Sequence, residues 1–261
     1  MALKNEFKQN TFCWVELEAP DVEAARNFYA PLFGWSFEEK AVAGGDEPYV
    51  IARKGGDYAA GILRGKNGRW VSNIAVADVD ATVAKARNLG FFVVEEPRDW
   101  GGKGRAATLR DLEGAEFALW QAKEPHTAER NTAGSFCWTE LLTNDREGMQ
   151  KLYADLFGWQ PKTMPDMPHY VMFYLGDTMV AGLMEITKEM AGAKPSWFVY
   201  FSVEDCDATA KKAEAARARS LLAPRDIPNV GRFSMLADPF GAAFGIIKLR
   251  PAVGQGEMKT A

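Results

Sequence analysis

The sequence is short of the residue types that commonly bind metals and phosphates. Histidine occurs only twice, as His126 and His169, and cysteine three times, as Cys13, Cys137 and Cys206, with no CxxC pair. The net charge is -4 and no block of Lys and Arg stands out, which argues against nucleic acid as a partner. No run approaches about 18 apolar residues, so we expect no membrane span.

What the sequence does contain is typical of a globular protein with a substantial core. It has 261 residues, of which 47% are hydrophobic, 12% aromatic and 25% charged, and this length allows one large or two ordinary domains. The N-terminus, MALKNEFKQN, lacks the apolar run of a signal peptide. The isolated cysteines fit small buried residues in a reducing compartment, so the default expectation is a cytoplasmic location.

Much of the sequence occurs twice. FCWVEL (12–17) and NFYAPLFGW (27–35) return as FCWTEL (136–141) and KLYADLFGW (151–159), both at an offset of 124. AAGIL (59–63) and VAGLM (180–184) differ by 121, as expected if loops had changed length. The repeat predicts two domains, over 5–123 and 130–250, with a polar linker at 124–134.

Each copy divides again into two βαβββ units. In the first unit a strand, TFCWVELEA, precedes a helix with Asp21 as N-cap and Gly34 as C-cap, and further short strands follow. The same order predicts four units, at about 5–65, 68–123, 130–187 and 194–250. The sequence therefore predicts an α+β fold in which helices cover one face of curved sheets.

Two motifs give this pattern a family likeness. FYAPLFGW and LYADLFGW follow the first strand of each copy, and DLEGAEFAL and DPFGAAFGI stand near its end. Together they resemble the vicinal oxygen chelate superfamily, which includes glyoxalase I, bleomycin-resistance proteins and extradiol dioxygenases. The resemblance covers residues 8 to 250 and implies two tandem domains with cup-shaped sheets, each cup holding a site. Because shorter members dimerise to pair their modules, four modules in one chain are compatible with a monomer, and a homodimer stays open.

The resemblance also implies where a metal would bind. Metal-using members take a histidine or glutamine from a module's first strand and a glutamate from its last. Here these positions fall on residues without a suitable donor: Trp14, Val71, Ala118 and, less certainly aligned, Gly61 in copy one, and Trp138, Phe198, Gly245 and Gly182 in copy two. We therefore expect cups with no metal and no cofactor.

Strand alternation predicts what lines the first cup. If Trp14 faces inward, Phe12 and Glu16 share its face, while Cys13, Val15 and Leu17 point toward the helix.

The same alternation extends to the other strands. It places Phe136, Trp138 and Glu140 in the second cup, and it adds Asn73 to the first and Tyr200 to the second. Such a pocket suits a small apolar or aromatic ligand.

Several site residues have two interpretations at this point. Glu16 and Glu140 could bind a ligand or act as general bases if desolvated, or they could be rim residues held by arginine. Trp14 and Trp138 could contact the ligand or simply fill the former metal space.

The remaining candidates lie outside the first strands. Arg105 and Arg232 could pair with the two glutamates, hold a ligand anion, or be solvated. Structural roles are expected for Trp35, Trp159, Asp111 and Asp238, and His169 is expected at the surface.

Three functions follow. The first is a metal-free binding protein for small apolar or aromatic molecules. The second is a lyase or isomerase related to glyoxalases, or a dioxygenase relative, with Glu16 or Glu140 as base or with an unrecognised metal site. The third is an interaction module whose cups are filled by its own side chains.

Overall fold

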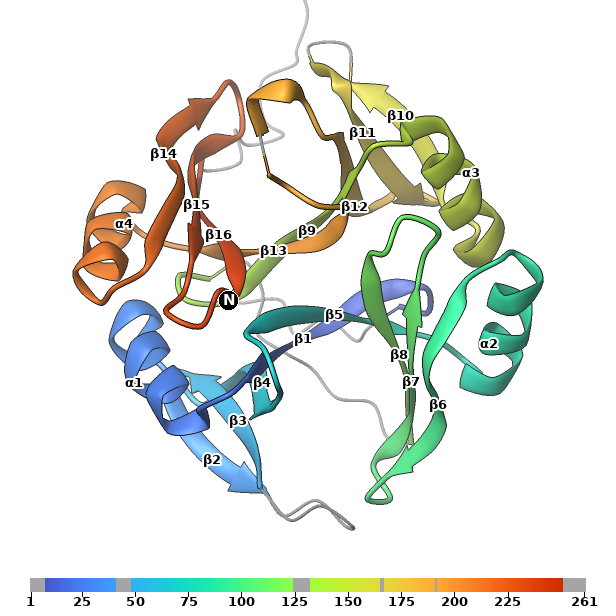
Figure 1. Ribbon diagram of the computed structural model, residues 1–261, viewed down its shortest axis with the longest axis horizontal. Helices are drawn as coiled ribbons and strands as arrows, with labels where there is room; N and C mark the ends of the chain where they lie inside the picture. Colours follow the sequence, from blue (N-terminus) through green and yellow to red (C-terminus); the bar gives the residue numbers. More distant parts are fainter. Residues whose placement is uncertain (1–7, 41–47, 124–131, 165–166, 191, 251–261) are drawn as a thin grey trace, which may run out of the picture.

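Each half of the chain forms one eight-stranded sheet with two helices (Figure 1). The computed structural model describes residues 8–40, 48–123, 132–164, 167–190 and 192–250. Most of the predicted linker, together with His126, therefore lies outside the described residues. In the described part of the chain, no helix is both long and apolar enough to cross a bilayer.

The first half begins with β1 (Thr11–Ala19) and α1 (Val22–Phe33). The remaining elements of this half are β2 (Ser36–Lys40), β3 (Tyr49–Lys54), β4 (Asp57–Arg64), β5 (Arg69–Ala75), α2 (Val79–Asn88), β6 (Phe92–Trp100), β7 (Gly104–Arg110) and β8 (Glu116–Ala122). Asp21 and Gly34 cap α1 as predicted, with Gly34 in the left-handed region that glycine tolerates.

The second half repeats this order. It consists of β9 (Phe136–Thr143), α3 (Arg146–Phe157), β10 (Gln160–Met164), β11 (Met167–Leu175), β12 (Thr178–Glu185), a short 3₁₀ turn (Lys188–Met190), β13 (Ser196–Ser202), α4 (Cys206–Ala215), β14 (Arg219–Ile227), β15 (Gly231–Ala237) and β16 (Ala243–Leu249).

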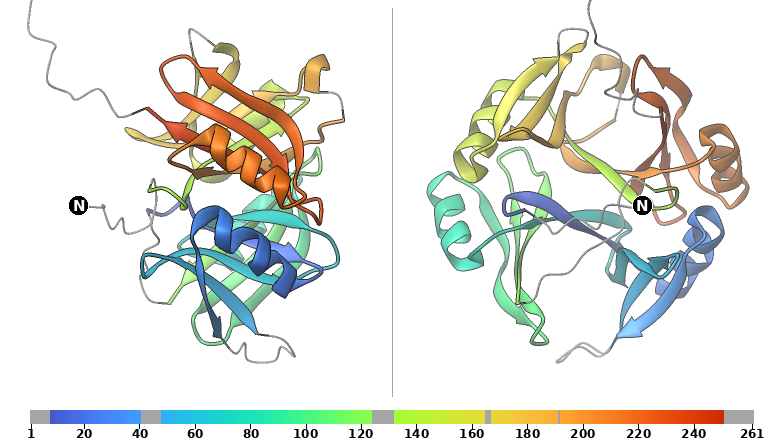
Figure 2. Two further views of the ribbon diagram at one scale, coloured as in Figure 1. Left: turned by 90° about the vertical axis from the view of Figure 1, so that its left-hand side faces the viewer. Right: turned by 180° about the vertical axis from the view of Figure 1, so that it is seen from behind.

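Strand order confirms the predicted α+β fold of paired βαβββ units. The sheets run β2-β3-β4-β1-β5-β8-β7-β6 and β10-β11-β12-β9-β13-β16-β15-β14. In each sheet the two units join through their first strands, β1 antiparallel to β5 and β9 antiparallel to β13. The outer strands curl away from this central pair and give each sheet a concave face, the cup (Figures 1 and 2).

The two sheets lie back to back, with their cups facing in opposite directions and the helices at the sides (Figure 1). Helix α1 contacts α4, and α2 contacts α3, so each helix pair joins the two halves. Aromatic rings fill the space between the sheets: Phe12 lies 4.9 Å from Trp197, and Trp70 lies 4.9 Å from Phe201, between ring centroids. One continuous apolar core therefore serves both halves.

Two reciprocal hydrogen bonds cross this shared core. The hydroxyl of Tyr29 on α1 donates to Asp238 of the second half, and Tyr153 on α3 donates to Asp111 of the first half, each at 3.0 Å. The other oxygen of Asp111 accepts two backbone N–H groups of its own turn, at 2.9 and 3.0 Å. The predicted turn role of the aspartates is confirmed, and the bonds across the halves are additional.

Two tryptophans also tie the halves together. Trp35 donates its indole N–H to the carbonyl of Gly134 at 2.6 Å, and Trp159 donates to that of Asn10 at 2.7 Å. Both indoles are buried in the core, which agrees with their predicted structural role.

One part of the predicted strand alternation is wrong. A β-bulge interrupts the register between Phe12 and Trp14, and an equivalent shift lies between Phe136 and Trp138 in the second half. The extra residue turns Phe12 and Phe136 away from the cups and into the shared core. Cys137, the equivalent of Cys13, packs with the residues of the second cup.

Candidate functional site

A chain of hydrogen bonds crosses the floor of the first cup. We define this cup by Trp14, Glu16, Tyr49 and Asn73, from the central strands and β3. The indole of Trp14 donates to the hydroxyl of Tyr49 at 2.8 Å, and that hydroxyl donates to Glu16 Oε1 at 2.5 Å. Asn73 Nδ2 donates to the other oxygen, Oε2, at 3.1 Å. The structure therefore brings Trp14, Glu16 and Asn73 together as predicted.

The second cup, defined by Trp138, Glu140, Tyr170 and Tyr200, repeats the arrangement. Trp138 donates to the hydroxyl of Tyr170 at 2.9 Å, and Tyr200 donates to Glu140 Oε1 at 2.6 Å. Tyr170 lies near Glu140 and favours its charged form. Here Tyr200 stands where the first cup has Asn73.

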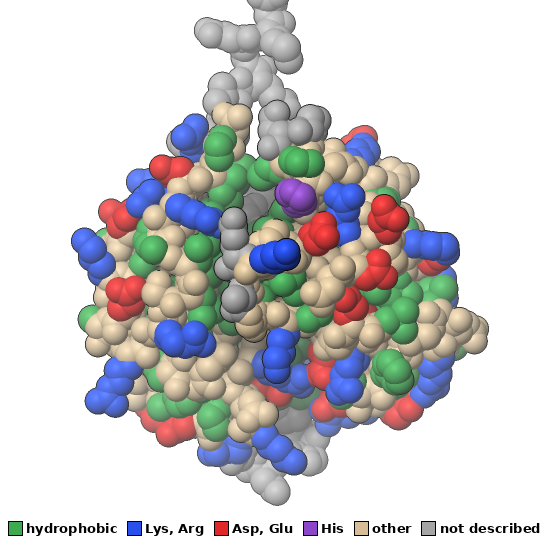
Figure 3. Space-filling model, turned by 45° about the horizontal axis from the view of Figure 1, so that its top comes forward, with side chains coloured by type: hydrophobic (Ala, Val, Ile, Leu, Met, Phe, Trp, Pro, Cys, Tyr) green, Lys and Arg blue, Asp and Glu red, His purple; other side chains and the backbone are tan. Residues whose placement is uncertain are grey.

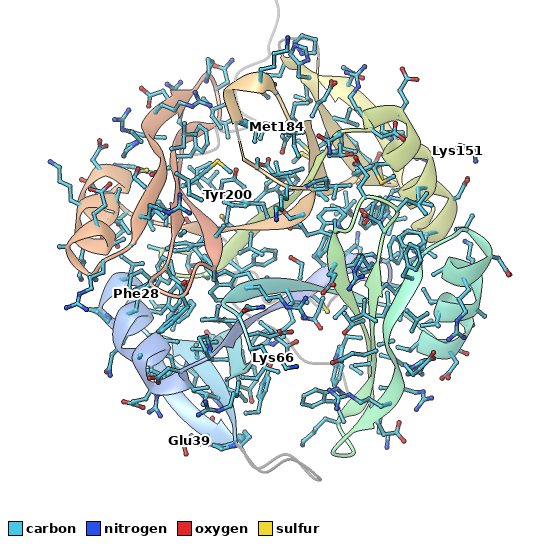
Figure 4. All side chains as sticks on the ribbon, viewed as in Figure 1. Phe28, Glu39, Lys66, Lys151, Met184 and Tyr200 are labelled. Atoms are coloured by element: carbon cyan, nitrogen blue, oxygen red, sulfur yellow. The ribbon has the colours of Figure 1, made fainter. Side chains whose placement is uncertain are left out.

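Apolar side chains surround the floor of the second cup. Phe198, Phe233, Met235 and Ile247 pack with Tyr200 in one buried cluster. Figure 4 shows Tyr200 and Met184 between the walls of the upper half, whereas Lys151 and Glu39 point outward. In Figure 3, viewed with this side forward, hydrophobic side chains gather around a hollow.

Burial changes the acidity of the two cup carboxyls. It raises the pKa of Glu140, which is 4% exposed, to about 7, although the phenols of Tyr200 and Tyr170 counteract this by bonding the charged form. Burial also raises the pKa of Glu16, and the nearby carboxylates Glu18 and Glu95 add to the effect. A carboxyl with a pKa near 7 can exchange a proton with a ligand at neutral pH.

A tyrosine hydroxyl lies against the glycine that the family resemblance aligned with a metal ligand in each cup. Glu16 pairs with Gly61 across the sheet, and Glu140 pairs with Gly182. A Cβ built on Gly61 would lie 1.9 Å from the hydroxyl of Tyr49, and one on Gly182 would lie 1.9 Å from that of Tyr170. Each phenol thus fills the place where a glutamate at the glycine position would begin.

The donor set does not fit the divalent ion of the metal-using members. Across the ranges that the structure describes, no group of three or more His, Cys, Asp or Glu side chains is placed to hold one. The positions Trp14, Val71 and Ala118 offer no carboxylate, thiolate or imidazole. The absence of a metal and of a cofactor remains a prediction about the protein in solution.

Sequence reasoning missed Tyr49 and Tyr170 as site residues. They are separated by 121 positions, the same offset that separates Gly61 from Gly182. That shared offset identifies them as equivalent. Strand alternation in β3 and β11 could have predicted that both side chains face the cups.

The arginine predictions are partly wrong. Arg105 forms two bonds to Asp80, at 2.6 and 2.9 Å, and Arg232 forms two to Asp207, at 2.5 and 2.8 Å. Both aspartates lie in the first turns of α2 and α4, on the helix side of the sheets. Neither arginine pairs with Glu16 or Glu140, because each shares a strand face with residues that pack on the helices.

The fit between glycine and tyrosine is testable by substitution. Gly61→Ala puts a methyl group on the hydroxyl of Tyr49, so Tyr49 must move; we expect a loss of about 1–3 kcal/mol in the free energy of unfolding. The indole N–H resonance of Trp14 should also shift, because its acceptor moves. In a Tyr49→Ala background, Gly61→Ala should cost much less, and equal costs in both backgrounds would contradict this packing.

A further pocket lies away from the cups, at the junction of α1 and α4. It has a volume of about 360 Å³ and is lined in part by Phe33, Lys54, Asp205 and Lys212. Both lysines already donate to carbonyls at the end of α1. This pocket contains none of the cup residues, and its lysines serve the contact between the halves.

Comparison with known proteins agrees with this geometry. Residues 14–120 match the family model "Glyoxalase-like domain", and residues 135–246 match "Glyoxalase/Bleomycin resistance protein/Dioxygenase superfamily". "Putative glyoxylase CFP32" of Mycobacterium tuberculosis is 38% identical, over 96% of this chain and 99% of its own length. "Anthracycline biosynthesis protein DnrV" of Streptomyces peucetius is 32% identical, over 93% and 96%.

Solved structures share the fold at lower identity. The Mn(II)-bound glyoxalase from Novosphingobium aromaticivorans superposes with a TM-score of 0.64 at 17% identity, covering 92% of this chain and 82% of that one. The 2,2',3-trihydroxybiphenyl 1,2-dioxygenase from Sphingomonas wittichii gives 0.64 at 13% identity, covering 92% and 91%. With two tandem family domains and relatives matched along nearly their whole length, the chain belongs to the glyoxalase/bleomycin resistance protein/dioxygenase superfamily, the vicinal oxygen chelate proteins.

Proposed function

We propose that the protein binds a small, largely apolar or aromatic molecule in its cups without the metal of the family. The observation that carries the proposal is the hydroxyl of Tyr49, which lies against Gly61 and bonds the carboxyl of Glu16. The hydroxyl of Tyr170 lies against Gly182 in the same way in the second cup. A phenol and a carboxyl in an aromatic pocket can orient a hydroxyl or carbonyl group of a ligand. The apolar side chains that surround the floor of the second cup supply the surface that such a ligand would bury.

The relatives' names support a small-molecule ligand. The 32% identical Streptomyces protein is named for anthracycline biosynthesis, and anthracyclines are small organic molecules. The cup glutamates and tyrosines of this chain would then recognise polar groups on an otherwise apolar frame.

The test uses metal-depleted protein and naphthylmethanol, a neutral aromatic probe. The indole N–H resonances of Trp14 and Trp138, assigned with Trp14→Phe and Trp138→Phe variants, report on each cup separately. We expect naphthylmethanol to shift at least one of them after chelation, to the same extent as before. Stoichiometric metal in the purified protein, or binding that requires added metal, would refute the proposal.

A second function, acid–base catalysis, is favoured by the pKa of about 7 at Glu140. A lyase or isomerase of this type would move a proton between ligand and carboxyl. For any substrate found, Glu140→Gln should abolish turnover while binding persists, because Gln keeps the shape and hydrogen-bond acceptor but cannot take the proton. Unchanged turnover in both Glu140→Gln and Glu16→Gln would show that neither carboxyl is the base.

A further inference from the structure

The two cups differ in the walls around their equivalent carboxyls. In the first cup, β5 and β7 carry Asn73, Ala106 and Thr108. At the matching positions on β13 and β15, the second cup carries Tyr200, Phe233 and Met235. Larger side chains therefore cover Glu140, which is buried, whereas Glu16 is only partly buried. The first cup therefore leaves Glu16 less covered than the second cup leaves Glu140.

Charge also distinguishes the first cup. Glu18 lies two residues after Glu16 on the same face of β1, and Glu95 lies on β6; both carboxylates disfavour ionisation of Glu16. The causes that shift the pKa of Glu140 include no such carboxylate. Of these three carboxylates, Glu18 and Glu95 each have an arginine partner, so Glu16 is the one left for a cationic ligand among the described residues.

The arginines near this cup pair with carboxylates other than Glu16. Arg69 binds Glu18, at 2.7 and 2.8 Å, and also Glu116. Arg110 binds Glu116 at 2.8 Å, and Arg98 lies 3.6 Å from Glu95. Among the described residues, no lysine or arginine forms an ion pair with Glu16, which is bonded by Tyr49 and Asn73.

Aromatic rings complete the surroundings. Tyr49 lies 6.1 Å from Trp100, between ring centroids, and Trp14 lies 6.4 Å from Tyr58. The guanidinium of Arg98 already lies 4.8 Å above the ring of Trp100. Aromatic rings beside carboxylates attract cations through the ring face and the negative charge together. In the second cup, Ile227 replaces Trp100 and Met179 replaces Tyr58 at the matching positions.

We propose that the first cup is selective for ligands that carry a cationic amine, with Glu16 as the residue that determines this specificity. The carboxyl of the second cup is covered by Tyr200 and apolar side chains, so this cup binds neutral ligands. This inference rests on the proposed function and assigns a ligand class to one of its two sites.

Three matched probes test it: naphthylmethylamine, naphthylmethanol and naphthylacetate, which share the ring and differ in charge. Binding to the first cup is followed through the indole resonance of Trp14, and binding to the second through that of Trp138. We expect the amine to bind the first cup about tenfold or more tightly than the alcohol, as a charge-assisted hydrogen bond to Glu16 would produce. The acid should bind that cup most weakly, and the second cup should not prefer the amine.

Glu16→Gln is the discriminating variant and Glu140→Gln its matched control. Loss of the amine preference in Glu16→Gln, with the preference kept in Glu140→Gln, is the expected result, and thermal unfolding checks that both variants are folded. Equal affinities of amine and alcohol at Trp14, or an amine preference that survives Glu16→Gln, would overturn the inference while leaving the proposed function intact. If none of the probes shifts either indole, the proposed function fails as well.

Discussion

Replacing Tyr153 by alanine is expected to lower the free energy of unfolding by about 3–5 kcal/mol, the usual cost of emptying a large buried aromatic site. Tyr153 is fully buried between the halves, and its ring lies 5.1 Å from that of Trp197. Its hydroxyl donates to Asp111 and accepts from the indole of Trp197 at 2.9 Å. The substitution therefore leaves a cavity. It also removes a hydrogen-bond partner from the carboxyl of Asp111 and from the indole N–H of Trp197.

Urea denaturation of three variants separates these contributions. Tyr153→Phe keeps the ring but removes the hydroxyl, so we expect a smaller loss of about 1–3 kcal/mol. Tyr29→Phe, the equivalent change in the other half, should cost about the same because Tyr29 bonds Asp238 and Trp70 in the same way. Losses below about 0.5 kcal/mol, typical of surface sites, would contradict the role assigned to these tyrosines.

Glu140→Gln is expected to stabilise the protein increasingly as the pH rises. Burial raises the pKa of Glu140 to about 7 in the folded protein, from 4.5 as the ordinary value. The folded state therefore favours the protonated carboxyl, and this stabilisation is fully present below pH 4.5 and lost as the pH rises through 7. Relative to the variant, wild-type protein should lose about 2–3 kcal/mol between pH 5 and pH 8.

Urea denaturation of wild type and Glu140→Gln at each pH measures this difference, and a ¹³C NMR titration of the Glu140 carboxyl measures its midpoint directly. In Tyr200→Phe the midpoint should move upward, because the phenol bonds the charged form. Glu16→Gln should show a pH dependence of the same sign, since burial raises that pKa too. If the difference in unfolding free energy between wild type and Glu140→Gln stays constant from pH 5 to pH 8, the raised pKa of Glu140 is contradicted.

Much of the fold could be predicted because the sequence repeats itself. The motifs around Trp35 and Trp159, and the helix caps Asp21 and Gly34, fix local structure through short-range chemistry and recur in both halves. The back-to-back packing of the sheets could not be predicted in the same way. It depends on contacts between residues far apart in the chain, such as Tyr29 with Asp238, which local patterns do not encode.

The site was predictable only where regular alternation holds. Trp14 and Glu16 lie two residues apart beyond the bulge, so their shared face was correct, whereas Phe12 lies on the other side of the bulge. Arg105 was misplaced because its partner, Asp80, lies on α2 on the helix side of the sheet, whereas Glu16 faces the cup. The hydroxyl of Tyr49 was missed since its approach to Gly61 depends on the pairing of β3 with β4.

The reciprocal bonds between Tyr29 and Asp238 and between Tyr153 and Asp111 constrain how this gene can recombine. A chimaera that takes one half from a distant homologue keeps both buried acceptors satisfied only if that homologue supplies a tyrosine and an aspartate at the matching places. The duplicated halves must therefore diverge as a co-evolving pair at these four positions, even while their cups are free to acquire different ligands.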